Sequence, residues 1–173
     1  MTTVALLRAV NVGGAGRLPM AVLREALEAA GAEEPRTYIQ SGNAVFRGTA
    51  EATEILHQIE TRAGFRPELL LIPADVFLYI RDANPFPEAA DDPKSLHVFF
   101  LSEPSPAPEA DLATAAGETE SVRLTERALY LHAPDGIGRS RFVARVERLL
   151  KVPVTARNWR TIDAIAGMIE SGA

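Results

Sequence analysis

Two segments of the sequence combine glycine, arginine and amide side chains in a way that is typical of anion-binding loops. The first segment is residues 11–17, NVGGAGR, which follow an apolar run and precede a helical pattern. Such a loop offers free backbone N–H groups, and the dipole of the following helix also favours negative charge. Arg8 and Arg17 flank the loop and would add charge-assisted hydrogen bonds to a phosphate or a carboxylate. The loop matches neither a P-loop nor a GxGxxG fingerprint, so the alternative that its glycines only let the chain turn stays open.

The second segment comprises residues 136–140, GIGRS, and residues 157–159, RNW. Ser140 is a residue type that caps helix N-termini, and Arg139 precedes it. A cation at a helix N-terminus opposes the dipole at a cost of up to about 1 kcal/mol, which a bound anion would remove. Solvation, or pairing with an acidic neighbour such as Asp135, is the alternative that stays open here.

The elements that must position these segments follow the same order in both halves of the chain. Apolar runs predict strands, apolar residues at helical spacing predict helices, and short turn sequences predict hairpins. In the first half the order β-α-β-β-α-β occupies residues 3–10, 19–30, 37–40, 44–47, 51–63 and 68–72. In the second half it occupies residues 97–101, 109–116, 121–124, 129–132, 140–150 and 152–156. Further helices are predicted over residues 74–81 and 161–171.

The repeated order predicts an α+β fold of two tandem ferredoxin-like βαββαβ subdomains with a C-terminal helix. The first subdomain is predicted over residues 1–82, and the second, with the closing helix, over residues 96–173. Residues 83–95 contain three prolines and several acidic residues, so they are predicted to form a linker.

The ferredoxin-like order also predicts which loops meet. The first two strands of a half run in the same direction, so the loop after the first strand and the hairpin turn share one edge of the sheet. The ligand-binding candidates at this edge of the first half are Arg8, Asn11, Gly13, Gly14, Arg17, Gln40, Ser41 and Asn43. The last two strands of the second half also run together, and the loops at their ends are expected to meet. The candidates there are Gly138, Arg139, Ser140, Arg157 and Asn158.

Patterns for catalysis or metal binding are sparse in this sequence. His57, His97 and His132 lie on different predicted elements and lack a metal-binding spacing such as HExxH. The absence of cysteine excludes thiolate catalysis and Cys-metal sites. Ser41 lies outside any GxSxG elbow, so no motif supports a Ser–His–Asp triad. No metal site is predicted, whether the protein uses a cofactor or is an enzyme stays open, and Trp159 is predicted to pack in the core.

Composition and charge favour a globular protein of the cytoplasm. Hydrophobic residues make up 47% of the 173 residues and charged residues 24%, which is sufficient for a sizeable core. The net charge of -5 argues against broad nucleic-acid binding, because that requires a surplus of Lys and Arg. The apolar run near the start is short and is interrupted by Arg8, so neither a signal peptide nor a membrane span is predicted.

Five motifs resemble an uncharacterised bacterial family, domain of unknown function 1697 (DUF1697). In chain order they are LLRAVNVGG, YIQSGNAVF, NPF, LYLHAPDGIGRS and TARNWRT. The family usually shows LLRGINVGG, QSGNVVF, GRSK and RNWNT, so Ala9, Ala44, Arg141 and Arg160 depart from its pattern. The resemblance implies an α+β fold with two ferredoxin-like subdomains and no established activity, substrate or cofactor.

Three functions are compatible with these observations. The first is the binding of a small anionic ligand, phosphate- or carboxylate-bearing, at the glycine- and arginine-rich loops. The second is nucleic-acid binding through the sheet faces, which the 6% aromatic content and the negative charge disfavour. The third is protein interaction through sheet edges or the acidic linker. The oligomeric state is not indicated by the sequence.

Overall fold

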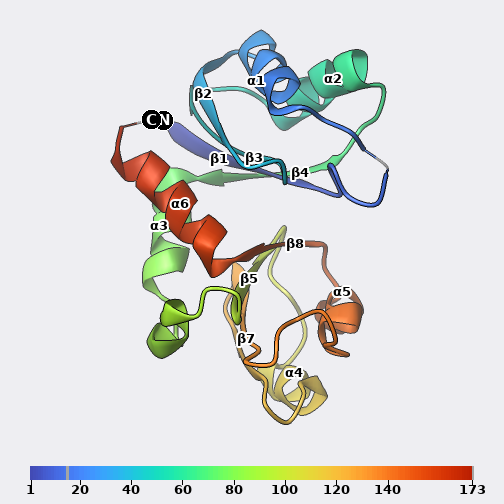
Figure 1. Cartoon of the computed structure of the whole chain (residues 1–173), viewed down its shortest axis with the longest axis vertical. Helices are drawn as coiled ribbons and strands as arrows, with labels where there is room; N and C mark the ends of the chain where they lie inside the picture. The colour runs from blue at the N-terminus through green and yellow to red at the C-terminus, as the bar shows by residue number, and fades with distance from the viewer. Residues whose placement is uncertain (15, 173) are drawn as a thin grey trace. The chain divides into compact units, whose positions relative to one another are not determined.

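The computed structural model describes residues 1–14 and 16–172. They form a mixed α+β protein with two four-stranded antiparallel sheets (Figure 1), which confirms the predicted α+β class. The chain divides into two compact units, one of Met1–Tyr79 with Asp163–Ala173 and one of Ile80–Ile162. This division groups the residues after Ile162 with the first half, whereas the boundaries drawn from the sequence place them in the second. No helix among the described residues is long and apolar enough to cross a membrane.

The first unit carries the sheet with strand order β2-β3-β1-β4. Its elements are β1 (Thr2–Arg8), α1 (Met20–Ala29), β2 (Ala32–Tyr38), β3 (Asn43–Gly48), α2 (Ala52–Ala63), β4 (Glu68–Pro73) and the start of α3 (Ala74–Asp82). Every pairing in this sheet is antiparallel. Since β1 and β2 both run against β3, they run in the same direction.

β1 lies inside this sheet, between β3 and β4, and its side chains are apolar on both faces. Residues 4–7 are completely buried. Ala5 and Leu7 belong to the core that α1 and α2 form with the sheet, together with Leu23 and Ile55. Figure 1 shows α1 and α2 on the same face of the sheet. A continuous apolar run is what burial on both faces requires.

The edge strand β2 is longer than the sequence predicts. It begins at Ala32, not at residue 37, and its register shifts between Glu33 and Arg36. Proline and acidic residues argue against a central strand, but an edge strand tolerates proline at a bulge. Glu34 takes φ 48 at this irregularity, and Pro35 is buried beside it.

Arg36 links this edge strand to the last helix, α6 (Trp159–Glu170). Its Nη2 donates a hydrogen bond to the carbonyl of Met168, and its Nη1 donates to Ser171 Oγ at 3.5 Å. A guanidinium at the C-terminal end of a helix satisfies a free carbonyl and complements the helix dipole. The Nε of Arg36 is buried and makes no hydrogen bond within the described structure.

The second unit repeats the topology with strand order β6-β7-β5-β8. Its elements are the 3-10 helix η1 (Pro87–Asp91), β5 (Leu96–Leu101), α4 (Glu109–Ala115), β6 (Ser121–Leu124), β7 (Ala128–His132), the 3-10 helix η2 (Val143–Arg145), α5 (Val146–Leu150) and β8 (Val154–Asn158), with the start of α6. β5 is central and runs antiparallel to both β7 and β8. Phe99 and Leu129 of the sheet form the core with Leu112 of α4 and Leu150 of α5.

The prediction of a continuous helix over residues 140–150 is wrong. The segment consists of η2 followed by α5, and Arg145 interrupts the helix with φ -120 and ψ 3. Phe142, Val146 and Leu150 all remain in the core. The three side chains keep their spacing of four residues and their place in the core although the helix is interrupted. Their burial, more than a continuous helix, stabilises this segment.

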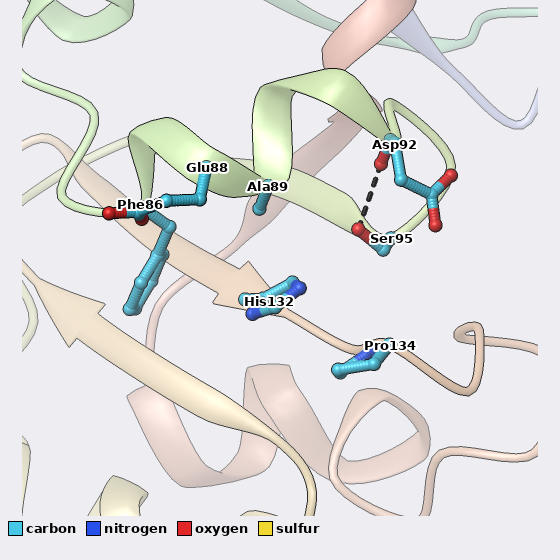
Figure 2. Close-up of a pocket in the computed structure, with 7 residues that line it drawn as sticks. All are labelled: Phe86, Glu88, Ala89, Asp92, Ser95, His132 and Pro134. Atoms are coloured by element: carbon cyan, nitrogen blue, oxygen red, sulfur yellow. Dashed lines mark hydrogen bonds between the residues drawn. The ribbon is translucent and has the colours of Figure 1, made fainter.

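Residues 83–95, the predicted linker, contain η1 and two side-chain-capped turns, of which Figure 2 shows the one between Asp92 and Ser95. Asn84 Oδ1 accepts a hydrogen bond from the Phe86 N–H at 2.9 Å. Ser95 Oγ donates to the carbonyl of Asp92 at 2.8 Å. Asn and Ser side chains make such turns because they replace a backbone partner locally.

Tyr130 joins β7 to the C-terminal end of α3 within the second unit. Its ring is almost fully buried, at 1% exposure, and its hydroxyl donates to the carbonyl of Ile80 at 2.6 Å. A buried carbonyl without a donor destabilises the folded state by its desolvation free energy, so this hydrogen bond contributes to stability.

We predict that Tyr130→Phe lowers the free energy of unfolding by about 1–3 kcal/mol, because the Ile80 carbonyl loses a buried donor. Urea denaturation followed by circular dichroism measures the change. The control is Tyr79→Phe, which removes a hydroxyl from a side chain that is 73% exposed. The control should alter stability by less than about 0.5 kcal/mol. Equal effects of the two variants would contradict the role given to the Tyr130 hydroxyl.

Candidate functional site

The loop after β1 and the β2–β3 hairpin turn lie at the same edge of the first sheet. The β1–β3 register places Leu6 opposite Asn43. One residue further on, the Leu7 N–H donates to the carbonyl of Gly42 at 2.8 Å. The turn therefore lies directly against the end of β1. We call residues 8–14 and 16–17 with the turn residues 39–43 the first loop cluster.

Asn11 ties the two loops of this cluster together with its side-chain amide. Its Nδ2 donates to the carbonyl of Gln40 at 2.6 Å and to the carbonyl of Leu18 at 2.8 Å. Its Oδ1 accepts the N–H of Leu18 at 2.8 Å. Its own backbone N–H donates to Gly16 at 2.9 Å, which closes the loop on itself. The amide of Asn11 is thus used to build the loop.

The backbone of the loop repeatedly adopts the left-handed conformation. Ala9, Asn11, Gly13, Gly14 and Gly16 all have φ between 55° and 79°. A Cβ at Gly16 would lie 2.7 Å from the carbonyl oxygen of Ala9, so this position also lacks room for a side chain. Gly13 and Gly14 are exposed and have open space around them. Where left-handed residues alternate with right-handed ones, the N–H groups turn toward one side and form a concavity that binds anions.

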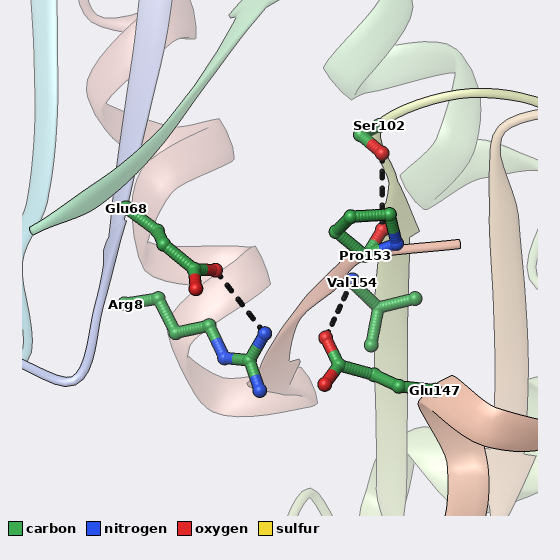
Figure 3. Close-up of polar contacts among 6 residues, drawn as sticks. All are labelled: Arg8, Glu68, Ser102, Glu147, Pro153 and Val154. Carbon is green, nitrogen blue, oxygen red and sulfur yellow. Dashed lines mark hydrogen bonds and ion pairs between the residues drawn. The ribbon is translucent and has the colours of Figure 1, made fainter. Parts of the chain in front are cut away.

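The two arginines of the first loop cluster have different surroundings. Arg8 Nη1 lies 3.2 Å from Glu68 Oε2 on the neighbouring strand β4 (Figure 3). The two side chains are 37% and 69% exposed, and ion pairs of that kind contribute only about 0.2–1 kcal/mol. Arg17 is exposed at the other end of the loop. An anion that contacts Arg8 therefore competes with Glu68 for the guanidinium.

Two of the predicted turn residues support the hairpin from inside. Asn43 is completely buried, and its Nδ2 donates to Ser41 Oγ at 2.9 Å and to the carbonyl of Tyr38 at 3.0 Å. Gly42 is also buried, and a Cβ there would lie 2.7 Å from Val10 and 2.8 Å from Leu7. Asn43 was predicted to contact a ligand. Its burial instead makes it a residue that shapes the turn.

Val12 and Ile39 are features of this cluster that the sequence interpretation missed. They are 58% and 51% exposed, and only Met1 and Tyr79 are comparable among the large hydrophobic residues of the described chain. Ile39 also has φ 48, which is unusual for a β-branched residue. Backbone strain of this kind concentrates at functional sites. The missed signal is an apolar residue placed between a strand and its turn, which looks like the end of the strand.

The loop candidates of the second unit make local hydrogen bonds. Gly138 and Arg139 are exposed, and Ser140 is half-buried. Ser140 Oγ accepts the N–H of Val143, the first residue of η2, at 3.1 Å.

The two candidates at the end of β8, Arg157 and Asn158, make hydrogen bonds to neighbouring backbone groups. Asn158 Oδ1 accepts the N–H of Thr161 at 3.0 Å and caps the first turn of α6. Arg157 Nη1 donates to the carbonyl of Ala156 at 2.8 Å. Burial lowers the pKa of Arg157 to about 10. Trp159, at 5% exposure, is buried as predicted.

The three histidines lie on separate elements, α2, β5 and β7. His57 is exposed, and the His132 ring lies 6.0 Å from the Phe86 ring. His97 is buried on β5 opposite Leu131, and its Nδ1 makes no hydrogen bond within the described structure. Burial lowers the pKa of His97 because the charged imidazolium is poorly solvated. Among the described residues, no three His, Asp or Glu side chains converge closely enough to hold a metal ion.

We predict that His97 makes the protein less stable at acidic pH. The unfolded imidazole titrates near 6.5, whereas the folded pKa is lower, so the unfolded chain binds more protons below pH 6.5. The free energy of unfolding should therefore fall as the pH drops from 7.5 to 5.5. Urea titrations of wild type and His97→Leu at both values measure this loss, which should be smaller in the variant. His57→Gln is the exposed control, and an identical loss in all three proteins would contradict the prediction.

We predict that Asn11→Gly loosens the first loop cluster without unfolding the protein. Glycine keeps the left-handed backbone accessible, but all three side-chain hydrogen bonds are lost. Amide hydrogen exchange at Leu18 should accelerate about 5- to 30-fold, the equivalent of roughly 1–2 kcal/mol. The amide of Ala30, at the end of α1, is the internal control. Unchanged exchange at Leu18 would show that Asn11 does not hold the loop.

Comparison with known proteins gives a family and a fold. The model of a family described as "Protein of unknown function (DUF1697)" matches residues 1–130. A solved structure of the conserved bacterial protein SP0830 from Streptococcus pneumoniae is similar over 96% of this chain and 97% of that chain. The TM-score is 0.62 and the sequence identity is 21%, so this similarity concerns the fold. No curated protein matches the chain.

Proposed function

The chain belongs to the family of proteins of unknown function DUF1697, and we propose that it binds a small anionic ligand at the first loop cluster. The observation that carries the proposal is the loop after β1, which Asn11 holds against the hairpin turn with its backbone in the left-handed conformation. A loop that is already fixed loses little entropy when a ligand binds.

The charges around the loop favour a phosphate or a carboxylate as the anionic group. Arg17 is exposed at one end, and Arg8 lies at the other in a weak ion pair with Glu68. Exposed Val12 and Ile39 lie one residue from Asn11 and Gln40, which are hydrogen-bonded to each other. A ligand with an apolar group next to its anionic group would cover both side chains. The ligand class we propose is therefore an amphiphilic phosphate or carboxylate.

We also propose that each half of the chain folds as a ferredoxin-like subdomain and that the protein resides in the bacterial cytoplasm. The orders β2-β3-β1-β4 and β6-β7-β5-β8, each with its two helices, support a ferredoxin-like subdomain in each half. The cysteine-free composition agrees with the bacterial cytoplasm. The loops of the second unit, with Arg139 and Ser140, are retained as a second candidate anion site of lower rank, because Ser140 Oγ already accepts the N–H of Val143.

A protein-docking edge is the alternative function, and the exposure of Val12 and Ile39 is the observation that favours it. A nucleic-acid module has less support, since the interior strands β1 and β5 are buried on both faces. RNA binding by such sheets uses exposed aromatic residues on one face.

The test is a titration with inorganic phosphate and with phenyl phosphate, followed by amide chemical shifts. We expect shifts at residues 12–14 and 17 and a lower Kd for phenyl phosphate, which adds an apolar ring. Arg17→Ala should raise either Kd about tenfold or more, because a charge-assisted hydrogen bond contributes about 1.5–3 kcal/mol. Arg127→Ala, at an exposed arginine in the turn between β6 and β7, is the matched control from the second unit and should leave both values unchanged. Shifts confined to residues 138–140, or none at all, would overturn the assignment to the first loop cluster.

The variant Val12→Ser/Ile39→Asn separates the ligand site from the docking edge. If the first loop cluster binds an amphiphilic anion, this variant should weaken the binding of phenyl phosphate and leave the binding of inorganic phosphate unchanged. For a docking edge, wild-type protein should bind neither phosphate and should retain a stoichiometric protein partner that the variant loses.

A further inference from the structure

A pocket of about 190 Å³ lies in the second unit, outside both anion-site candidates (Figure 2). It is lined by Phe86, Glu88, Ala89, Asp92, Ser95, His132 and Pro134. Phe86 comes from the NPF motif, and His132 and Pro134 come from the LYLHAPDGIGRS motif. Two sequence motifs that the proposed anion site leaves unexplained therefore meet at one pocket.

Hydrogen bonds fix the walls of this pocket. The turn at Asn84 sets the position of Phe86, since the Asn84 side chain bonds both the N–H and the carbonyl of Phe86. At the other end, the Ser95 hydroxyl and N–H both donate to the carbonyl of Asp92. The Ser95 carbonyl in turn accepts the N–H of Ala133 at 2.7 Å, which ties this wall to the end of β7. The Ser95 hydroxyl is thereby engaged in structure, which argues against a nucleophilic role.

The floor of the pocket is aromatic and apolar. The Phe86 and His132 rings lie 6.0 Å apart and are tilted by 37°. Figure 2 shows both rings on the same side of the η1 ribbon, with Pro134 beyond His132. Ala89 is buried and adds its methyl group. The face of the Phe86 ring attracts a cation through its negative potential, and the imidazole of His132 adds flat contact surface.

The charged residues that line the pocket are acidic. Glu88 and Asp92 are exposed and belong to η1 and to the residue that follows it. None of the seven lining residues is a lysine or an arginine. An anion is repelled from such a pocket, whereas a cation gains from both carboxylates. Since no three acidic or histidine side chains of the described chain converge on a metal position, an organic cation fits this lining better than a metal ion.

We propose that this pocket binds a small organic cation, an amine or a quaternary ammonium group on a short apolar chain. Its volume of about 190 Å³ is below the range of roughly 300–1,000 Å³ typical of drug-sized ligands, so the occupant is small. The aromatic floor contacts the alkyl groups around the nitrogen, and the two carboxylates supply the opposite charge. This proposal is independent of the anion site in the first unit.

The test uses choline as the probe and its neutral isostere 3,3-dimethylbutan-1-ol as the matched control ligand. We expect choline to shift the amides of residues 86–97 and 132–134 with a Kd on the order of millimolar, the value for a few weak contacts. The neutral alcohol should bind at least about tenfold more weakly, because it lacks the charge that the rings and carboxylates attract. Equal affinity for the two ligands, or shifts that map to other residues, would overturn the proposal.

Variants of the lining complete the test. Glu88→Gln/Asp92→Asn should raise the Kd for choline about tenfold and leave the weak binding of the alcohol unchanged, since only the charge is removed. Phe86→Leu should also weaken choline binding, because an apolar side chain replaces the ring face. Asp111→Asn, an exposed carboxylate on α4, is the control that should change neither affinity. Thermal denaturation verifies that each variant is folded, and a folded double variant with wild-type affinity for choline would refute the role of the carboxylates.

Discussion

β1 forms backbone hydrogen bonds with β3 on one side and with β4 on the other, and the position of every loop around it follows from these two registers. Its interior residues 4–7 are fully buried, so a slip by one residue would exchange the side chains of its two faces. Because Leu6 is opposite Asn43, the end of β1 must lie beside the hairpin turn. β5 has the same place between β7 and β8 in the other sheet.

The first loop cluster shows how a fixed backbone and free surface coexist in a few residues. Asn11 supplies the hydrogen bonds that a buried segment would require, yet Val12, Gly13 and Gly14 stay exposed. The left-handed conformation of Ala9 and Ile39 costs free energy that the surrounding structure must offset. Rigid loops with unfavourable local conformations and accessible surface are the usual setting of binding sites.

Much of the fold is predictable from the sequence because burial on two faces demands a visible pattern. The apolar run of β1 and the turn residues at positions 41–43 mark their elements directly, and three of the five motifs lie wholly within the residues that the family model matches. The strand predicted from the sequence is shorter than β2, because Pro35 and its acidic neighbours are untypical of a strand interior. The ion pair of Arg8 with Glu68 depends on a register between strands 60 residues apart, which no local pattern specifies. The burial of Asn43 and the backbone of Ile39 are equally set by tertiary packing.

The pairing of β1 with β4 has a consequence for how the protein is made. Arg8 and Glu68 are partners separated by 60 residues, so β1 is synthesised well before β4 can reach it. At roughly 5–20 residues per second, the interval is about 3–12 s. During that time one edge of an apolar strand has no native neighbour, and other nascent chains or a chaperone can occupy it. The native neighbour of that edge exists only once β4 has been synthesised, so β4 completes the protection of β1.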